Sequence, residues 1–161
     1  MTDATVELVL DPHTDELVRA EWEALAEAGH SSMAAHPWAT NRPHITVVGA
    51  APRSAIRLLG GAGLVVPFAV TLGPPVLLGS GPRRVLARLV VPSIPLRRLH
   101  TAVHAHLGTT DDDWVPHVTL AKRLRLESLP EALLLLGEQI TGQVTGIRSY
   151  DPDSRSVTAI A

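Results

Sequence analysis

The sequence predicts an α+β fold with two similar lobes in tandem, and two observations support this prediction. The pattern Pro-His-(Ile/Val)-Thr-(Val/Leu) occurs at residues 43–47 and again at residues 116–120. Around each copy, the apolar pattern favours the same succession of a strand, a long helix, the motif strand, a shorter helix and further strands. Such a pseudo-repeat would set the two motif strands side by side in a central cleft. We expect one bilobal domain over residues 1–161.

Composition places the chain among ordinary globular proteins. Its 161 residues are 45% hydrophobic and 19% charged, which suits one compact domain with a core and argues against disorder. There is no cysteine, so disulfides, thiolate nucleophiles and cysteine-based zinc sites are excluded. Met1-Thr2-Asp3-Ala4 does not begin a signal peptide, and the apolar run 64–72 is too short to span a bilayer. We expect a cytoplasmic protein with no membrane partner.

Charge and aromatic content narrow the range of partners. The net charge of −2 argues against a general grip on duplex DNA, which requires many phosphates to be neutralised. Residues 1–80 carry 4 Arg against 8 acidic residues, whereas residues 81–161 carry 10 Arg plus Lys against 8. Three Trp, one Tyr and one Phe are few for stacking along an extended single strand. A nucleotide or RNA-end substrate fits better. The sequence does not determine the oligomeric state, and a monomer is the default expectation.

The first strand and the first long helix are predicted from residues 6–29. Residues 6–10 are β-prone, and Asp11-Pro12 supplies an N-cap followed by proline in the first helical turn. Gly29 ends the helix. The apolar residues that recur at helical spacing between these ends are Leu17, Val18, Trp22, Leu25 and Ala26. Trp22 is therefore predicted to lie in the core.

The elements that follow are shorter. A polar loop over residues 30–41 leads into the first motif strand at about 43–49, and residues 49–52 are predicted to break that strand. A short helix is expected over 53–59, and a strand over 65–72 whose proline marks it as an edge or a strand start.

A hairpin is predicted next. Gly73-Pro74-Pro75 and residues 79–82 are typical of turns, with a brief strand between them. The strand at 84–91 alternates, which predicts Val85, Ala87 and Leu89 toward the core and Arg84 and Arg88 toward solvent.

The remaining elements mirror the first half of the chain. They are a helix over 93–107, a polar acidic loop over 108–113, the second motif strand at about 115–121, a helix over 126–136, and a closing hairpin of residues 142–150 and 156–160. Trp114, in the second motif strand, is predicted to be core.

The helix over 93–107 carries a candidate metal site. His100 and His104 lie four residues apart on the flank of its apolar stripe, which consists of Leu96, Leu99, Val103 and Leu107. No glutamate stands in the H-E-x-x-H register and no third ligand is evident nearby, so a solvated helix flank is the favoured interpretation. A His-based metallohydrolase would need a third histidine such as His13 or His36.

The repeated motif predicts chemistry on a bound anion. Side chains alternate along a strand, so His44 and Thr46 point the same way, as do His117 and Thr119. Two imidazoles and two hydroxyls around one phosphate are enough for metal-free acid–base cleavage of a phosphodiester. A single H-x-T arises by chance about 0.6 times in this composition, whereas recurrence of five matched positions is far rarer.

The two motifs resemble the pair that defines the 2H phosphoesterase superfamily, also called the 2′-5′ RNA ligase-like family. In this chain they are His44-Ile45-Thr46-Val47 and His117-Val118-Thr119-Leu120. Three further segments fall in the order typical of that family: Arg84-Val85-Leu86, Trp114-Val115-Pro116 and the Asp-Pro-Asp-Ser hairpin at 151–154. The resemblance covers nearly the whole chain. It implies a bilobal fold of two pseudo-symmetric antiparallel-sheet lobes, with helices outside and the motifs in the central cleft.

The resemblance also implies an activity and site residues. His44 and His117 would be the catalytic pair, and Thr46 and Thr119 would bind phosphate oxygens. Many members have arginine two residues after the leucine of the second motif. Lys122 stands there in this chain and keeps the charge without the bidentate fork. The implied activity is metal-independent cleavage of phosphodiesters, often nucleoside 2′,3′-cyclic phosphates, without a cofactor.

Two more residues are candidates for substrate binding. Trp38 could stack a base at the cleft mouth or could lie in the core. Arg42 could add positive potential beside His44 or could be a solvated surface arginine. The alternative function is a non-catalytic module that binds RNA or a nucleotide. The sequence leaves open the substrate, the product isomer, the balance of ligation and hydrolysis, and which histidine is the acid.

Overall fold

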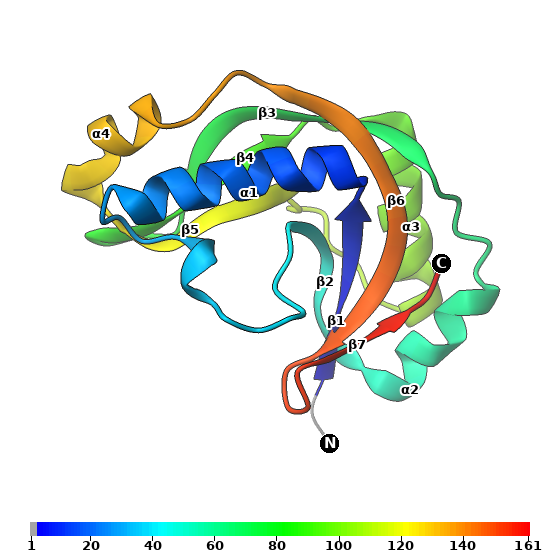
Figure 1. The fold of residues 1–161 in the computed structure, drawn as a ribbon. Helices are drawn as coiled ribbons and strands as arrows, with labels where there is room; N and C mark the ends of the chain where they lie inside the picture. The colour runs from blue at the N-terminus through cyan, green and yellow to red at the C-terminus, as the bar shows by residue number, and fades with distance from the viewer. Residues whose placement is uncertain (1–2) are drawn as a thin grey trace.

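A computed structural model describes residues 3–161 and contains one curved, antiparallel, seven-stranded sheet with helices packed against it (Figure 1). The strands are β1 (Asp3–Leu10), β2 (His44–Pro52), β3 (Phe68–Leu78), β4 (Arg83–Val90), β5 (His117–Arg125), β6 (Ile140–Asp151) and β7 (Ser156–Ala159). Their order is β2-β1-β6-β3-β4-β5, and β7 pairs with β6. The predicted α+β class is confirmed. Met1 and Thr2, part of the segment used to judge a signal peptide, lie outside the described residues.

The two long helices begin after a capping side chain, and the first of these caps, Asp11, is the one that the sequence predicts. The helices are α1 (Pro12–Glu27), α2 (Arg53–Ile56), α3 (Ile94–Leu107) and α4 (Leu129–Leu134), with short 3₁₀ turns at Met33–Ala35, Arg57–Gly61 and Leu126–Ser128. The Asp11 carboxylate caps α1 by accepting a hydrogen bond from the Thr14 amide at 2.9 Å, and Ser93 caps α3 in the same way. The helix predicted over 126–136 is shorter than expected. Within residues 3–161, no helix is long and apolar enough to cross a membrane.

The sheet consists of two equivalent halves joined through β6. One half is β2-β1-β6 and the other is β5-β4-β3, and each contains a strand, a long helix and a motif strand in succession. Residues 140–144 of β6 pair with β3, and residues 144–150 pair with β1. The predicted pseudo-repeat is therefore present, and its two halves share one continuous sheet.

The motif strands β2 and β5 are the two ends of this row of strands, yet they contact each other because the sheet curves (Figure 1). His44 is the first residue of β2 and His117 is the first residue of β5. Both strands have nine residues and the same succession of buried and exposed positions. Curvature of the sheet thus brings together two motifs that are far apart in the sequence.

Two predicted strand breaks are wrong. Gly73-Pro74-Pro75, expected to be a turn, lies inside β3, which also absorbs the brief strand predicted after it. Residues 68–72 pair with β6 whereas residues 75–78 pair with β4, so the strand changes partner at a shift in register. Prolines are tolerated at such irregularities. Likewise β2 continues through residues 49–52, because this segment still pairs with the start of β1.

The predicted orientation of Arg88 is also wrong. The alternation places Arg88 toward solvent, but it is 1% exposed and shares its face with the buried residues Leu86 and Val90. Its guanidinium donates to both carboxylate oxygens of Glu21, each at 2.6 Å, and to the carbonyl oxygens of two glycines. The bidentate ion pair balances the charge of Arg88, and the two carbonyl contacts satisfy further donors of its guanidinium. Together they explain how an arginine is accommodated in this core.

Candidate active site

Each motif strand presents its histidine and its threonine on one face. His44 and Thr46 are partly exposed in β2, and His117 and Thr119 are partly exposed in β5. The residues that alternate with them are at most 1% exposed, namely Ile45, Val47, Val118 and Leu120. Burial of these apolar side chains fixes the orientation of the polar ones, because a one-residue slip would exchange the two faces.

The two histidine rings are held in the same way. Nδ1 of His44 bonds the carbonyl oxygen of Arg42 at 2.8 Å, and Nδ1 of His117 bonds the carbonyl oxygen of Val115 at 2.7 Å. The proline between the two residues of each pair keeps the preceding residue extended. A carbonyl oxygen only accepts hydrogen bonds, so Nδ1 carries a proton in both rings. Nε2 is therefore the nitrogen that can exchange a proton with a substrate.

The two threonine hydroxyls are available to a ligand. Neither Thr46 nor Thr119 has a side-chain hydrogen bond to another of the residues 3–161, and both are partly exposed. A hydroxyl of this kind can donate one hydrogen bond to a phosphate oxygen.

Two tryptophan side chains donate hydrogen bonds to the motif strand of the opposite half of the sheet. Trp22 of α1 donates Nε1–H to the carbonyl oxygen of Thr119 at 3.1 Å, and Trp114 donates to the carbonyl oxygen of Thr46 at 3.0 Å. Carbonyl groups on the outer side of an edge strand otherwise lack a strand partner. Trp22 is 3% exposed, as its helical spacing predicts, whereas Trp114 packs against the core but stays partly exposed.

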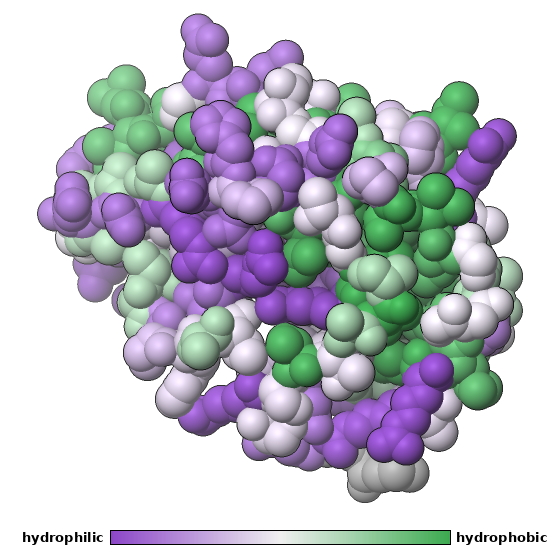
Figure 2. Space-filling model, turned by 45° about the vertical axis from the view of Figure 1, so that its right-hand side comes forward, coloured by the Kyte–Doolittle hydropathy of each residue, from purple (hydrophilic) through white to green (hydrophobic). Residues whose placement is uncertain are grey.

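A pocket of about 170 Å³ lies beside His44, and Lys122 and Trp38 also line it. Trp38 is 44% exposed, with the guanidinium of Arg155 3.7 Å from its ring centre, so it is a surface residue rather than a core residue. The pocket lining does not include His117, Thr46, Thr119 or Arg42. Figure 2 shows hydrophilic side chains gathered near the centre of one face of the molecule.

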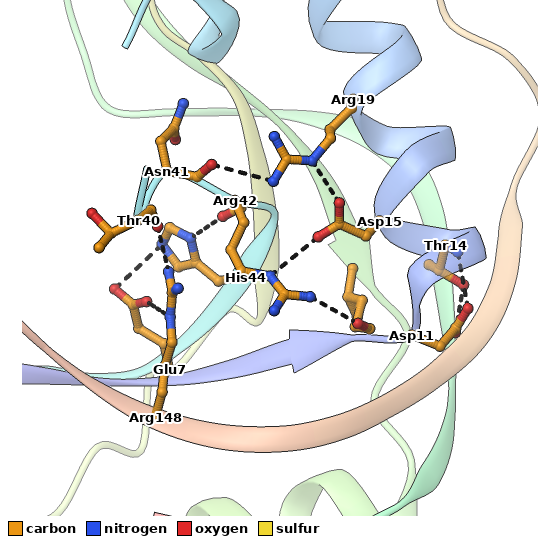
Figure 3. Close-up of polar contacts among 11 residues, drawn as sticks. Glu7, Asp11, Thr14, Asp15, Arg19, Thr40, Asn41, Arg42, His44 and Arg148 are labelled. Carbon is orange, nitrogen blue, oxygen red and sulfur yellow. Dashed lines mark hydrogen bonds and ion pairs between the residues drawn. The ribbon is translucent and has the colours of Figure 1, made fainter. Parts of the chain in front are cut away.

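Two charged residues of this pocket escaped the sequence analysis. The Glu7 carboxylate lies 3.6 Å from Nε2 of His44 and accepts a hydrogen bond from Nε of Arg148 at 2.9 Å (Figure 3). Glu7 pairs with Thr46 on one side and with Arg148 on the other, so the three residues form a row across β2, β1 and β6. In the sequence, the sign of this row is Glu7, a charged residue inside the apolar run 6–10. Its neighbours Thr46 and Arg148 become evident once the pairing of the strands is known.

Arg42 is engaged in structural contacts. Its Nε lies 3.2 Å from Asp15, which also pairs with Arg19 at 2.6 Å, and its Nη2 donates to the carbonyl oxygen of Leu10 (Figure 3). These contacts tie the first motif to the start of α1. Arg42 is therefore not a solvated surface arginine, which was one of the two roles considered from the sequence. It is also not part of the pocket that contains His44.

The prediction of a solvated flank for the two histidines of α3 is wrong. His104 is 8% exposed, and the side chain of His100 is 13% exposed. Within residues 3–161, the group of side chains able to hold a metal ion consists of these two and Asp111. The third group is therefore an aspartate from the following loop rather than His13 or His36.

Comparisons with known proteins identify the fold and the family of this chain. The family model described as the 2′-5′ RNA ligase superfamily matches residues 14–154. The solved structure of E. coli LigT in apo form has a TM-score of 0.58 and 13% identity, and the match covers 98% of this chain and 94% of that chain. The structure of E. coli LigT complexed with 3′-AMP has a TM-score of 0.58 and 14% identity, and the match covers 98% of this chain and 92% of that chain. The structure of Kluyveromyces marxianus Usb1 with uridine monophosphate has a TM-score of 0.50 and 12% identity, and the match covers 98% of this chain and 96% of that chain. No curated protein matches.

The solved structures establish the likeness of fold, and the family match adds a likeness of sequence. That match spans most of the chain and includes both His-x-Thr motifs and the strands β2 and β5 that carry them. The chain therefore belongs to the 2′-5′ RNA ligase superfamily of 2H phosphoesterases.

Proposed function

We propose that this protein is a metal-independent phosphodiesterase for RNA-type phosphodiesters, which opens nucleoside 2′,3′-cyclic phosphates by two-histidine acid–base catalysis. The observation that supports this most is the equivalence of the two motifs. Each places a histidine, with Nδ1 held by a carbonyl oxygen, beside a threonine hydroxyl on the same face of a strand. Together they offer an acid, a base and two donors to a phosphate. The proposed setting is the cytoplasm, with the whole chain as a single bilobal domain.

In the proposed reaction, a water molecule attacks the phosphorus of the cyclic phosphate. One histidine takes a proton from that water at Nε2 while the new P–O bond forms. The other histidine donates a proton from Nε2 to the ribose oxygen while its bond to phosphorus breaks. The product is a nucleoside monophosphate with one freed ribose hydroxyl. Imidazole can serve as either a proton donor or a proton acceptor, so one ring can take each role.

Phosphate binding is assigned to Thr46, Thr119 and Lys122. The two hydroxyls point the same way as the histidines of their strands, and Lys122 is exposed in the lining of the pocket that contains His44. Donors placed in advance stabilise the negative charge that grows on the non-bridging oxygens. The ammonium of Lys122 is a compact charge without the two parallel donors of an arginine. Orientation of the phosphate therefore depends more on the threonine hydroxyls than on Lys122.

The base of the substrate is assigned to the pocket beside His44. Trp38 and Tyr150 line this pocket, and both offer aromatic surface for stacking. Its size suits one base rather than an extended strand. Solved structures of the same fold hold 3′-AMP in E. coli LigT and uridine monophosphate in Usb1, which supports a substrate of nucleotide size.

The test is a substrate panel run in EDTA. The protein is incubated with the four 2′,3′-cyclic nucleotides and with 2′-5′ dinucleotides, and the products are separated by chromatography and identified as 2′- or 3′-phosphates. Opening of the cyclic nucleotides without added metal is expected. Binding of nucleotides with no product at any pH would instead favour a non-catalytic binding module. Turnover that appears only after a metal is added would overturn the proposal.

A further inference from the structure

Two histidines and an aspartate lie together between α3 and the loop over residues 108–113, apart from the proposed active site. One ligating atom from each of His100, His104 and Asp111 lies within 4.8 Å of the other two. None of the three lines the pocket beside His44. We infer that this cluster binds one Zn²⁺ ion, and that the ion has a structural role rather than a part in phosphodiester cleavage.

The ring of His104 is prepared for metal binding. Its Nε2 lies 3.2 Å from the carbonyl oxygen of Val47, and because a carbonyl only accepts, Nε2 carries the proton. The lone pair is then on Nδ1, which lies 2.8 Å from the hydroxyl of Thr109. Histidine ligands of metals usually donate their other ring N–H to such a carbonyl, which fixes the tautomer. Thr109 is exposed in the loop, so it can release Nδ1 to an ion.

The ring of His100 has an unsatisfied nitrogen. Its Nε2 is buried without a hydrogen-bond partner and lies 3.7 Å from Oδ2 of Asp111, beyond hydrogen-bonding range. An ion between this nitrogen and the carboxylate would satisfy both groups.

The donor set favours zinc. Two imidazoles and one carboxylate can hold Zn²⁺ with the fourth position left to water, and the structural role is inferred from the place of the cluster rather than from this ligand count. Tetrahedral bonds of about 2.0–2.2 Å place neighbouring ligand atoms about 3.3–3.6 Å apart, so the cluster has to contract from separations of up to 4.8 Å. The Asp111 side chain is 38% exposed within the loop over 108–113, which allows that movement. An adjoining pocket of about 360 Å³, lined by His100, Asp111 and Asp112, offers an entry path.

The position of the cluster explains its structural role. The ring of His100 stacks on Trp114 at 4.1 Å, and Trp114 donates a hydrogen bond to the carbonyl oxygen of Thr46. His104 bonds the next carbonyl along β2, that of Val47. Zinc binding would therefore fix the loop over 108–113 against the back of the first motif strand.

The experiment measures zinc binding directly. Untagged full-length protein is stripped with EDTA, dialysed and titrated with ZnCl₂ by calorimetry, and the melting temperature is recorded in parallel. We expect saturation at one ion per chain and a rise in Tm of about 5–10 °C at a Zn²⁺ concentration 100-fold above Kd. Replacing Zn²⁺ with Co²⁺ is expected to give the visible absorption of a tetrahedral site.

Matched variants locate the site. Asp111→Asn and His100→Gln are expected to weaken Zn²⁺ binding by at least about 10- to 100-fold, the loss typical of even an outer-sphere partner. Asp113→Asn in the same loop and His106→Gln on the same helix are exposed controls and should bind as the wild type does. Circular dichroism checks that each variant is folded. Absence of saturable binding, or equal binding by the wild type and Asp111→Asn, would overturn the inference. Either result leaves the phosphodiesterase proposal intact, because that activity is assayed in EDTA.

Discussion

The carboxylate of Glu7 lies 3.6 Å from Nε2 of His44, and among residues 3–161 no carboxylate makes the equivalent contact with His117 of the second motif. Thr46 of the first motif pairs with Glu7 in the neighbouring strand, whereas Thr119 of the second motif pairs with Ala87. The two halves of the sheet therefore match in backbone but differ in charge. In the proposed site, a carboxylate therefore lies beside the first histidine and not beside the second.

Glu7 is expected to matter for stability. Glu7→Gln removes the charge that compensates the largely buried Arg148, and breaking a buried ion pair on one side typically costs about 3–5 kcal/mol. Urea unfolding followed by circular dichroism measures this loss. Glu16→Gln, at an exposed position of α1, is the control and should change stability by less than about 0.5 kcal/mol. Equal stability of the two variants would contradict a buried Glu7–Arg148 pair.

The two histidines are expected to be indispensable for turnover. His44→Ala and His117→Ala each remove one proton-transfer group from a partly exposed position, so activity should fall to background while the fold is kept. Opening of a 2′,3′-cyclic nucleotide in EDTA gives the rate, and circular dichroism gives the fold. His13→Ala, exposed at the start of α1, should retain full activity. Turnover that survives either motif substitution would remove the proposed mechanism.

The threonines are expected to contribute less than the histidines. Thr46→Val and Thr119→Val keep the shape of the strand but delete one donor each, which should lower kcat by about 100-fold. Steady-state kinetics should show the loss mainly in kcat, because the donors act on charge that grows during the reaction. Thr145→Val, exposed on β6, controls for the substitution itself. A change in KM alone would mean that the hydroxyls only bind the substrate.

Asp11 is expected to make stability depend on acid pH. Burial raises the pKa of Asp11, but hydrogen bonds from Thr14 and from the amide of Gln143 outweigh it and hold the pKa below 3.8. A depressed pKa means that the folded state favours the carboxylate. Its contribution is complete above pH 3.8 and is lost as the pH falls through the lower, folded-state value. Asp11→Ala should cost about 1 kcal/mol at pH 7, as loss of an N-cap does.

Unfolding curves over a pH series check the Asp11 prediction. The gap between wild type and Asp11→Ala should narrow as the pH falls below 3.8, because protonation removes the same interaction from the wild type. Asp113→Ala, in an exposed loop, is the comparison that should show no such gap. A gap that stays constant from neutral to acid pH would mean that the charge of Asp11 contributes nothing.

Local patterns were enough to predict most elements and the motif geometry. The alternation around His44 and Thr46 predicts their shared face, and Ile45 and Val47 confirm it by their burial. The capping residue Asp11 likewise predicts the start of α1. Each of these features depends on neighbours within a few positions, which is the range that sequence periodicity covers.

Features that depend on distant partners were missed. Arg88 is buried because Glu21, 67 positions away, neutralises it, and Arg148 reaches Glu7 across 141 positions. Sequence spacing alone gives no hint of either pair, so a charged residue in a strand is assigned to solvent by default. Asp111 was missed as a partner of His100 for a related reason, since the loop that carries it folds back against α3.

The middle position of β6 has a consequence for assembly of the protein. Residues 140–144 pair with β3 and residues 144–150 pair with β1, so the strands of the two halves are not joined into one sheet until residues 140–151 are in place (Figure 1). A chain cut ahead of this segment would leave one edge of β1 and one edge of β3 unpaired, and unpaired strand edges promote aggregation. Limited proteolysis that removes the segment from β6 onward should therefore break the sheet into one part with β1 and β2 and another with β3, β4 and β5.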